Sequence, residues 1–328
     1  MKRAVVTGTS GHLGEALAIT LADRCEVVGV DIKPGPHTTH LVSVDDAAAM
    51  ADLMAGVTHV FHAATLHKPH VATHRKQQFV DGNISGTLAL LEAAARQGVE
   101  AFVFTSTTSA FGASLVPPPG APAAWITETV PCVPKNIYGS TKTAAEDLCH
   151  LFHCTKGLPC LVLRTSRFFL EADDNAETRA RYADENIKAV EFLYRRVDIE
   201  DIVTSHLLAA ARAPELGFGR YIISATTPFL PEDCAGLGRD APQVLRQRVP
   251  EYEEIFEARD WVMVPTLDRV YDNAAARRDL NWQPKHDFRS VLRAVSNGDD
   301  PRSELALKVG SKSYHDEVFE EGPYPVET

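Results

Sequence analysis

The chain of 328 residues is long enough for one large α/β unit or two modest domains around a sizeable core. Its hydrophobic content of 45% is that of an ordinary globular protein, and its net charge of −11 disfavours nucleic acid or an anionic membrane as a partner. No apolar run reaches the roughly 18–20 residues of a membrane helix, and the six cysteines lack zinc-binding spacing, so we expect a cytoplasmic protein with reduced thiols.

A glycine-rich turn joins the first predicted strand, residues 2–7, to the first predicted helix, residues 15–23. Because the strand begins at residue 2, we expect no signal peptide. Glycine permits a sharp turn, close approach of backbone to a phosphate, and close packing of helix on strand. Free N–H groups at a helix N-terminus attract anions, so this order predicts a site for a dinucleotide pyrophosphate. Its predicted contacts are Gly8, Ser10, Gly11, His12, Leu13 and Gly14.

An acidic residue ends the second predicted strand, residues 25–31. A carboxylate at Asp31, 17 positions past Gly14, could accept hydrogen bonds from both hydroxyls of an adenosine ribose and would repel a 2′-phosphate. An aspartate at a strand end is also often merely solvated. Next to the glycines we interpret Asp31 as a determinant of NAD, while Lys33 leaves NADP open.

Strand-like and helix-like segments then alternate, which is typical of a parallel sheet covered by helices on both faces. The further predicted segments are strands at 57–64, 101–106, 158–164 and 220–224 and helices at 83–97 and 138–156. We therefore predict a doubly wound α/β fold. Its predicted parts are a nucleotide-binding domain (1–167), a smaller substrate lobe (168–300) that returns one strand to the sheet, and a tail (301–328).

A proline-rich stretch, residues 113–136, interrupts this alternation. Long loops without secondary structure inside compact domains are usually functional or disordered. Because this stretch lies between two motifs that carry chemistry, we expect a lid-like loop over the site.

A tyrosine and a lysine, Tyr138 and Lys142, lie four residues apart on one face of a predicted helix. A free tyrosine has a pKa of about 10, too high for a general base at neutral pH, and a nearby ammonium lowers that pKa. The pair could then exchange a proton with an alcohol or ketone oxygen. The hydroxyl-rich residues 105–109 close the preceding strand, where one hydroxyl could bind the same oxygen.

Together these motifs resemble an extended short-chain dehydrogenase/reductase of the NAD-dependent epimerase/dehydratase family. The resemblance implies an enzyme that moves a hydride between NAD and a secondary alcohol or ketone carbon of a small polar substrate, such as a sugar or hydroxy acid. The alternative is a sugar or nucleotide-sugar epimerase or dehydratase that recycles tightly bound NAD. A cofactor-sensing protein without turnover is a third possibility, against which the retained Tyr138 and Lys142 count.

The resemblance also implies roles for single residues. Tyr138 would be the acid/base, Lys142 would hold the nicotinamide ribose and lower the tyrosine pKa, and Thr107 would be the catalytic hydroxyl. Asn83 would support the active-site helix and a water relay, and the helices of Asn83 and Tyr138 would form a homodimer. Further expected cofactor contacts are Asp45 at the adenine, Ala63, Ala64, Thr65, Thr105 and Phe168.

Several positions keep alternatives open. Thr107 could merely cap a turn, with Ser106 or Thr108 sharing its role. The substrate candidates are His67, Thr108 and Arg167. A guanidinium at Arg167, where many relatives have Asn, suits a substrate carboxylate, but it could equally pair with the acidic residues 173–174.

Two further patterns bear on the ligand. Five histidines between residues 59 and 74 invite a metal site, but Pro69 interrupts their helical spacing and we expect no metal. Nucleotide-sugar epimerases of this family carry a long insertion after the strand at 158–164, whereas here only about 25 residues separate Phe169 from Arg195. These relatives also have an arginine about ten residues before the segment that matches Asp272, and this chain lacks it. Both departures count against a nucleotide-sugar substrate.

Overall fold

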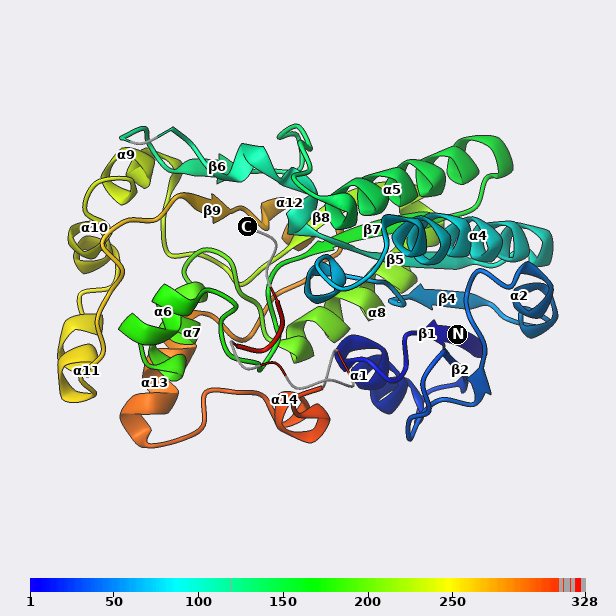
Figure 1. Ribbon diagram of the computed structural model, residues 1–328, viewed down its shortest axis with the longest axis horizontal. Helices are drawn as coiled ribbons and strands as arrows, with labels where there is room; N and C mark the ends of the chain where they lie inside the picture. The colour runs from blue at the N-terminus through cyan, green and yellow to red at the C-terminus, as the bar shows by residue number, and fades with distance from the viewer. Residues whose placement is uncertain (119, 313–314, 316–318, 320–321, 326–328) are drawn as a thin grey trace.

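The computed structural model describes residues 1–118, 120–312, 315, 319 and 322–325, and it shows the expected alternation of strands and helices (Figure 1). The strands are β1 (Arg3–Thr7), β2 (Glu26–Asp31), β3 (His40–Leu41), β4 (His59–His62), β5 (Ala101–Thr107), β6 (Ala124–Ile126), β7 (Cys160–Thr165), β8 (Phe218–Ile223) and β9 (Arg269–Tyr271). The α-helices are α1 (His12–Leu21), α2 (Ala47–Leu53), α3 (Lys76–Phe79), α4 (Gly86–Gln97), α5 (Ile137–Lys156), α6 (Ala176–Arg181), α7 (Asp184–Glu191), α8 (Ile199–Leu216), α9 (Cys234–Leu237), α10 (Ala241–Arg248), α11 (Tyr252–Ala258), α12 (Ala274–Asp279), α13 (Phe288–Asn297) and α14 (Glu304–Val309). No helix of the described residues combines the length and apolarity needed to cross a membrane.

Seven strands form one parallel sheet in the order β3-β2-β1-β4-β5-β7-β8. Alternate residues of a strand face opposite sides of a sheet, and here both sides are buried. Val6 and Phe61 face a core beneath α1 and α8, whereas Val5 and Val60 face a second core beneath α4 and α5. The predicted doubly wound α/β fold is therefore confirmed, and its C-terminal strand ends meet along one edge.

The segment around Asn83 differs from its prediction. Residues Val80–Ser85 form a π-helical turn, and α4 begins only at Gly86. On this helix Leu88 is 36% exposed, whereas Leu91 is fully buried. Since successive residues are 100° apart around a helix, residues three apart are offset by 60°, which moves Leu88 to the margin of the buried face.

The proline-rich stretch is not structureless. Its strand β6 pairs in parallel with β9 of the C-terminal lobe, and Gly112 forms a bridge to Val133. Gly112 has a φ of +52°, and a Cβ there would lie 1.9 Å from the Val133 carbonyl oxygen. The stretch is thus held at two points: its ends meet at the Gly112–Val133 bridge, and its middle pairs with β9, far along the chain.

The C-terminal lobe has a core of its own, formed mainly by helices α7, α9, α10, α11 and α13. Strand β8 lies at the edge of the sheet, next to β7. After the lobe, α14 packs on α1 and α8. The division into residues 1–167, 168–300 and 301–328 stays a prediction.

Candidate functional site

A cavity of about 460 Å³ opens at the C-terminal ends of the central strands. Most residues predicted for the site line it. They are Gly8, Ser10, Gly11, His12, Leu13, Gly14, Asp31, Ala63, Ala64, Thr65, His67, Thr105, Thr107, Thr108, Tyr138, Arg167 and Phe168. One continuous cavity thus joins the glycine turn to the tyrosine, as an extended dinucleotide requires.

The glycine turn is built by close backbone approach. Gly8 has a φ of +78°, and a Cβ there would lie 2.8 Å from the Ala64 nitrogen. A Cβ on Gly14 would lie 2.0 Å from the Gly8 carbonyl oxygen, so α1 can pack on β1 only without that atom. As a result, the N-terminus of α1 faces the cavity through Gly11, His12 and Leu13.

Asp31 lies at the end of β2, with its carboxylate fixed by two backbone amides. Ser10 N–H donates to one oxygen at 2.9 Å and Lys33 N–H donates to the other at 2.8 Å. Both oxygens keep acceptor capacity for ribose hydroxyls, because a carboxylate has about four lone-pair positions. This arrangement fits NAD.

A buried chain of hydrogen bonds ties the glycine turn to the helix behind it. The Ala63 and Ala64 amides donate to the Thr7 hydroxyl at 3.1 and 3.0 Å, and that hydroxyl meets His62 Nδ1 at 2.8 Å. The other ring nitrogen meets the Thr87 hydroxyl at 3.0 Å. Burial lowers the pKa of His62 to about 3, so its ring is neutral and structural.

Tyr138 lies at the far end of the cavity and is 8% exposed. Its hydroxyl hydrogen-bonds with the Thr107 side chain. Burial raises the tyrosine pKa to about 12, and the bond to Thr107 offsets only part of that rise. The expected lowering of this pKa by Lys142 stays a prediction, because the influences found on the phenol are its burial and Thr107.

Lys142 does not line the cavity but lies behind it, 2% exposed. Its ammonium donates to the Thr105 carbonyl at 2.6 Å and lies 4.0 Å from the centre of the Phe104 ring. Burial lowers its pKa to about 7, against the opposing effect of Glu146.

Thr107 both caps a turn and contacts Tyr138. Its side chain accepts a hydrogen bond from the Ser109 amide at 3.1 Å. Of the alternatives, Ser106 is engaged elsewhere, because its hydroxyl donates to Glu146 at 2.5 Å. Thr108 lines the cavity.

Asn83 and Asp45 lie outside the cavity lining. The Asn83 amide group donates to the Leu66 carbonyl at 2.9 Å and to the Thr141 hydroxyl at 3.0 Å. It thereby links the chain after β4 to α5, as a supporting residue should. Asp45 is exposed, and its neighbour Val44 lines the cavity instead.

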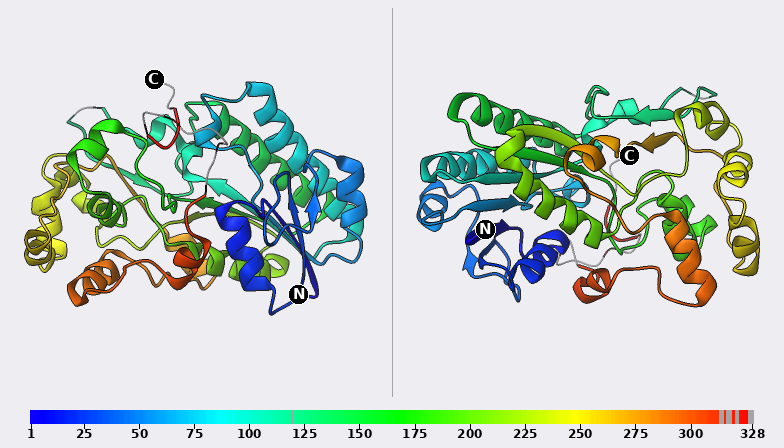
Figure 2. Two further views of the ribbon diagram at one scale, coloured as in Figure 1. Left: turned by 60° about the horizontal axis from the view of Figure 1, so that its bottom comes forward. Right: turned by 180° about the vertical axis from the view of Figure 1, so that it is seen from behind.

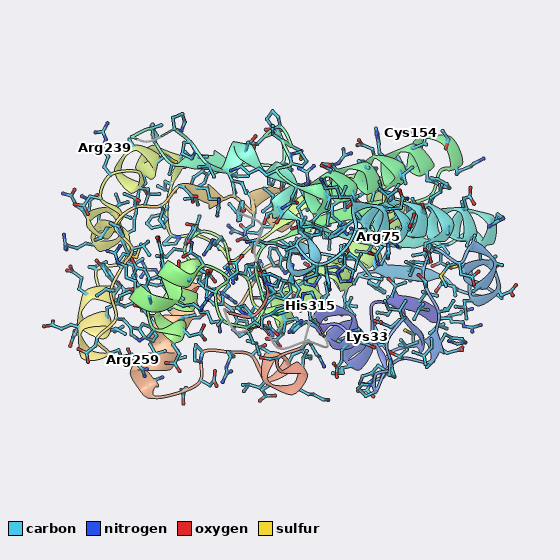
Figure 3. The ribbon with its side chains drawn as sticks, viewed as in Figure 1. Lys33, Arg75, Cys154, Arg239, Arg259 and His315 are labelled. Carbon is cyan, nitrogen blue, oxygen red and sulfur yellow. The ribbon has the colours of Figure 1, made fainter. Side chains whose placement is uncertain are left out.

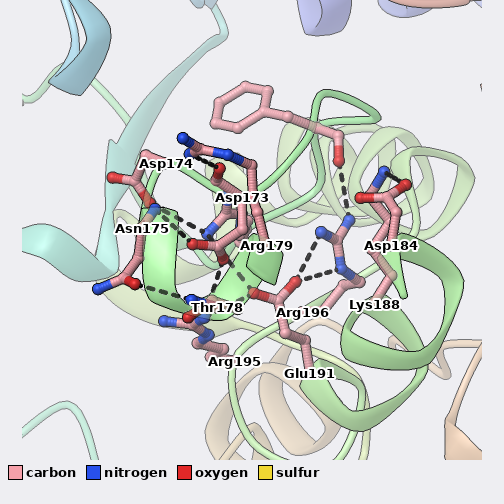
Figure 4. A network of polar contacts seen from close by, with 12 residues as sticks. Asp173, Asp174, Asn175, Thr178, Arg179, Asp184, Lys188, Glu191, Arg195 and Arg196 are labelled. Carbon is pink, nitrogen blue, oxygen red and sulfur yellow. Dashed lines mark hydrogen bonds and ion pairs between the residues drawn. The ribbon is translucent and has the colours of Figure 1, made fainter. Parts of the chain in front are cut away.

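Arg167 is held mainly by acidic side chains. This favours the alternative that its guanidinium forms a structural ion pair, rather than binding a substrate carboxylate. Its Nη1 lies 2.9 Å from Asp173 and 3.5 Å from Glu191. Glu191 also pairs with Arg195 at 2.8 Å and Arg196 at 2.6 Å (Figure 4). Although burial raises the pKa of Glu191, these arginines lower it to about 2.

Three polar atoms at the substrate end of the cavity are buried without a hydrogen-bond partner among the described residues: Ser166 Oγ, Arg195 Nε and Arg269 Nε. Sequence reasoning did not select these residues. The three residues line the cavity, although these particular atoms are themselves buried. The cationic residues of the lining are Lys33, Lys68, Arg167, Arg195, Arg269 and Lys312, whereas its described acidic residue is Asp31 alone.

The histidines do not assemble a metal site in the part of the chain that the structure describes, where no group of three or more suitable side chains is found. His67 and His70 have ring centres 4.9 Å apart and both line the cavity. Burial lowers the pKa of His67 well below its usual value.

A doubly wound sheet with a glycine turn, an acidic end to β2 and a Tyr-Lys pair at the cavity defines an extended short-chain dehydrogenase/reductase. The chain belongs to the NAD dependent epimerase/dehydratase family, whose profile matches residues 4–215. NAD is the cofactor of this family, and the residues described above fit it.

The chain is similar to two kinds of curated protein. It is 29% identical over 182 residues to the "Uncharacterized UDP-glucose epimerase YtcB" of Bacillus subtilis, an alignment covering 49% of this chain and 54% of that protein. It is 26% identical over 330 residues to the "3 beta-hydroxysteroid dehydrogenase/Delta 5-->4-isomerase" of Mycobacterium tuberculosis, covering 86% of each. The alignments with three relatives named as epimerases span about half of the length of those proteins or less.

The fold is also that of solved epimerases. The UDP-glucose 4-epimerase of Thermus thermophilus in complex with NAD superposes with a TM-score of 0.60, at 22% identity, over 89% of this chain and 96% of that one. At this identity the likeness establishes the fold alone.

Proposed function

We propose that the protein is an NAD-dependent sugar epimerase or dehydratase, which oxidises a secondary alcohol carbon of its substrate and returns the hydride within one catalytic cycle. The observation that carries the proposal is the hydrogen-bonded pair of Tyr138 and Thr107 in the same cavity as the glycine turn. When bound, NAD supplies the carbon that accepts and returns the hydride. The family and the epimerase relatives support this reading.

In this mechanism Tyr138 takes the proton of the substrate hydroxyl and Thr107 orients both oxygens. Proton removal needs a phenolate, which burial of Tyr138 disfavours because it raises the tyrosine pKa to about 12. A cationic Lys142 would stabilise that phenolate from behind. Asp31 would bind the adenosine ribose, and Gly11, His12 and Leu13 the pyrophosphate.

The substrate we propose carries an anionic group. Arg195 and Arg269 line the cavity and bring two guanidinium groups to it. Phosphate and carboxylate oxygens are the acceptors that guanidinium groups bind best. A nucleotide-sugar diphosphate and a sugar carboxylate both meet this requirement.

A net oxidoreductase acting on a small polar substrate is the second candidate. The alignment with the hydroxysteroid dehydrogenase of Mycobacterium tuberculosis favours it, since this match covers 86% of both chains. The two candidates differ in the fate of the reduced cofactor.

A homodimer through α4 and α5 also stays a proposal, supported by the exposed Leu88 and Leu151 on these helices.

The experiment that tests the proposal is to purify the protein without added cofactor, denature it, and quantify released NAD and NADP by mass spectrometry. Near-stoichiometric NAD, with interconversion of an anionic sugar and no net NADH, is the result expected for an epimerase. Protein that is empty but forms NADH with substrate would support the oxidoreductase instead. A protein that neither contains nor binds NAD would refute both.

A further inference from the structure

We propose that Lys312, which follows α14, completes the cofactor site, with its ammonium as a ligand of the NAD pyrophosphate. This proposal rests on the NAD-binding part of the proposed function and is independent of the substrate. Lys312 lines the same cavity as Gly11 and His12, although it lies about 300 residues further along the chain. The glycine turn itself, residues 8–14, contains no lysine or arginine.

The backbone at Lys312 is fixed against the start of α1. Its N–H donates to Glu171 Oε1 at 2.8 Å, and the same oxygen lies 2.9 Å from His12 Nε2. The Glu171 side chain is 13% exposed, so these bonds are largely shielded from water. One carboxylate thus joins the C-terminal segment to the helix turn that faces the pyrophosphate.

The ammonium of Lys312 lies beside that turn and pairs with Glu15 of α1. The Lys312 side chain is 24% exposed and that of Glu15 is 9% exposed. A partly buried ammonium attracts a phosphate more strongly than a fully solvated one, because less water screens it. The pyrophosphate carries two negative charges, and the helix N-terminus provides only partial positive charge. Lys312 therefore supplies a full cation where the turn has none.

Helix α14, which precedes Lys312, lies beside α1 (Figures 1 and 2). His315, labelled in Figure 3, has its Nε2 3.0 Å from the Pro69 carbonyl oxygen and its ring centre 5.3 Å from that of His70. Further on, Tyr324 lines the cavity and is 8% exposed. The described residues Lys312 and Tyr324 thus both line the cavity that would hold NAD.

The competing explanation is that Lys312 merely neutralises Glu15. The two explanations differ in a double variant. If neutralisation is the whole role, removing both charges in E15Q/K312M restores NAD affinity. If Lys312 binds the pyrophosphate, the double variant stays as weak as K312M.

The test is to measure the Kd and dissociation rate of NAD by calorimetry and stopped-flow fluorescence on the full chain. We expect K312M to weaken NAD and ADP-ribose alike by roughly 10- to 100-fold, the range of a charged hydrogen bond. K312R should keep most of the affinity, and the control K308M, at an exposed lysine of α14, should change nothing. Unchanged NAD affinity in K312M, or restoration in E15Q/K312M, overturns the Lys312 proposal and leaves the proposed function intact. A wild-type protein that fails to bind NAD refutes the proposed function itself.

Discussion

The Lys142 ammonium donates a hydrogen bond to the backbone carbonyl of Thr105 over 2.6 Å. Thr105 lies two residues before Thr107, the partner of Tyr138. The lysine is thus bound to the end of β5, the strand that also carries Thr107. Its pKa of about 7 lets the lysine gain or lose its charge near neutral pH.

Replacing Tyr138 with phenylalanine tests the acid/base role. We expect Y138F to reduce turnover by roughly 10²- to 10⁴-fold, the usual contribution of a positioned proton donor or acceptor. NAD affinity should change little, because the ring stays in place. Turnover and NAD binding are measured together, with Tyr182→Phe, at a residue outside the cavity lining, as the control. Normal turnover by Y138F would contradict the mechanism.

Asp31 should decide between NAD and NADP. Its carboxylate is fixed by the Ser10 and Lys33 amides and lines the cavity. Asp31→Ala should raise the Kd of NAD by about tenfold or more, because charged hydrogen bonds contribute about 1.5–3 kcal/mol, and NADP should gain affinity since the repulsion is removed. The control is Asp23→Ala, at an exposed residue beyond α1. A variant with unchanged preference would show that Asp31 does not contact the ribose.

The central sheet could be predicted because each of its strands carries a local signal. Val5 and Val6 face opposite cores, so a run of apolar residues indicates burial on both sides. The pairing of β6 with β9 has no such signal. Each strand has three residues, and about 145 residues separate them, so only the folded lobe brings them together.

The same distinction applies to the site. Asp31, Thr107 and Tyr138 follow from strand ends and helix spacing, because the ends of parallel strands share one edge. Arg195 and Arg269 enter the cavity from the lobe, whose packing no short motif describes. The predicted effect of Lys142 on the tyrosine pKa stays a prediction, because the influences found on the phenol are its burial and Thr107.

Glu146 should be a major stabilising residue behind the site. Its carboxylate is 1% exposed and accepts hydrogen bonds from Ser106 at 2.5 Å and Arg164 at 2.7 Å. Arg220 lies 3.1 Å from the same group. Glu146→Gln leaves buried guanidinium charge without its partner, which typically costs about 3–5 kcal/mol.

The measurement is the free energy of unfolding in urea. Asp147→Asn is the matched control, because Asp147 pairs with the same Arg220 but is 80% exposed. A surface pair of this kind contributes about 0–1 kcal/mol. If the two variants lower the free energy of unfolding equally, the buried Glu146 carboxylate stabilises the protein no more than the exposed Asp147 carboxylate does.

Stability should fall in mild acid because His206 is buried in its neutral form. Its Nε2 lies 2.8 Å from the Thr105 hydroxyl and its Nδ1 2.8 Å from the Ile202 carbonyl oxygen. Burial lowers its pKa from 6.5 to about 4, against the opposing effect of the Ile202 bond. Between pH 6.5 and 4 the unfolded chain therefore binds a proton that the folded chain does not. The free energy of unfolding should decrease over this window, by up to about 3 kcal/mol for this group.

The pH dependence of unfolding in His206→Gln isolates this contribution. The variant should be less stable at pH 8, because the bond to Thr105 changes, but its stability should decline less steeply between pH 6.5 and 4. His62, whose pKa burial lowers to about 3, keeps part of the slope in the variant. His150→Gln, at an exposed residue of α5, should leave the slope unchanged. If the free energy of unfolding of His206→Gln decreases as steeply between pH 6.5 and 4 as that of the wild type, His206 is protonated in the folded protein. The assignment of a neutral ring then fails.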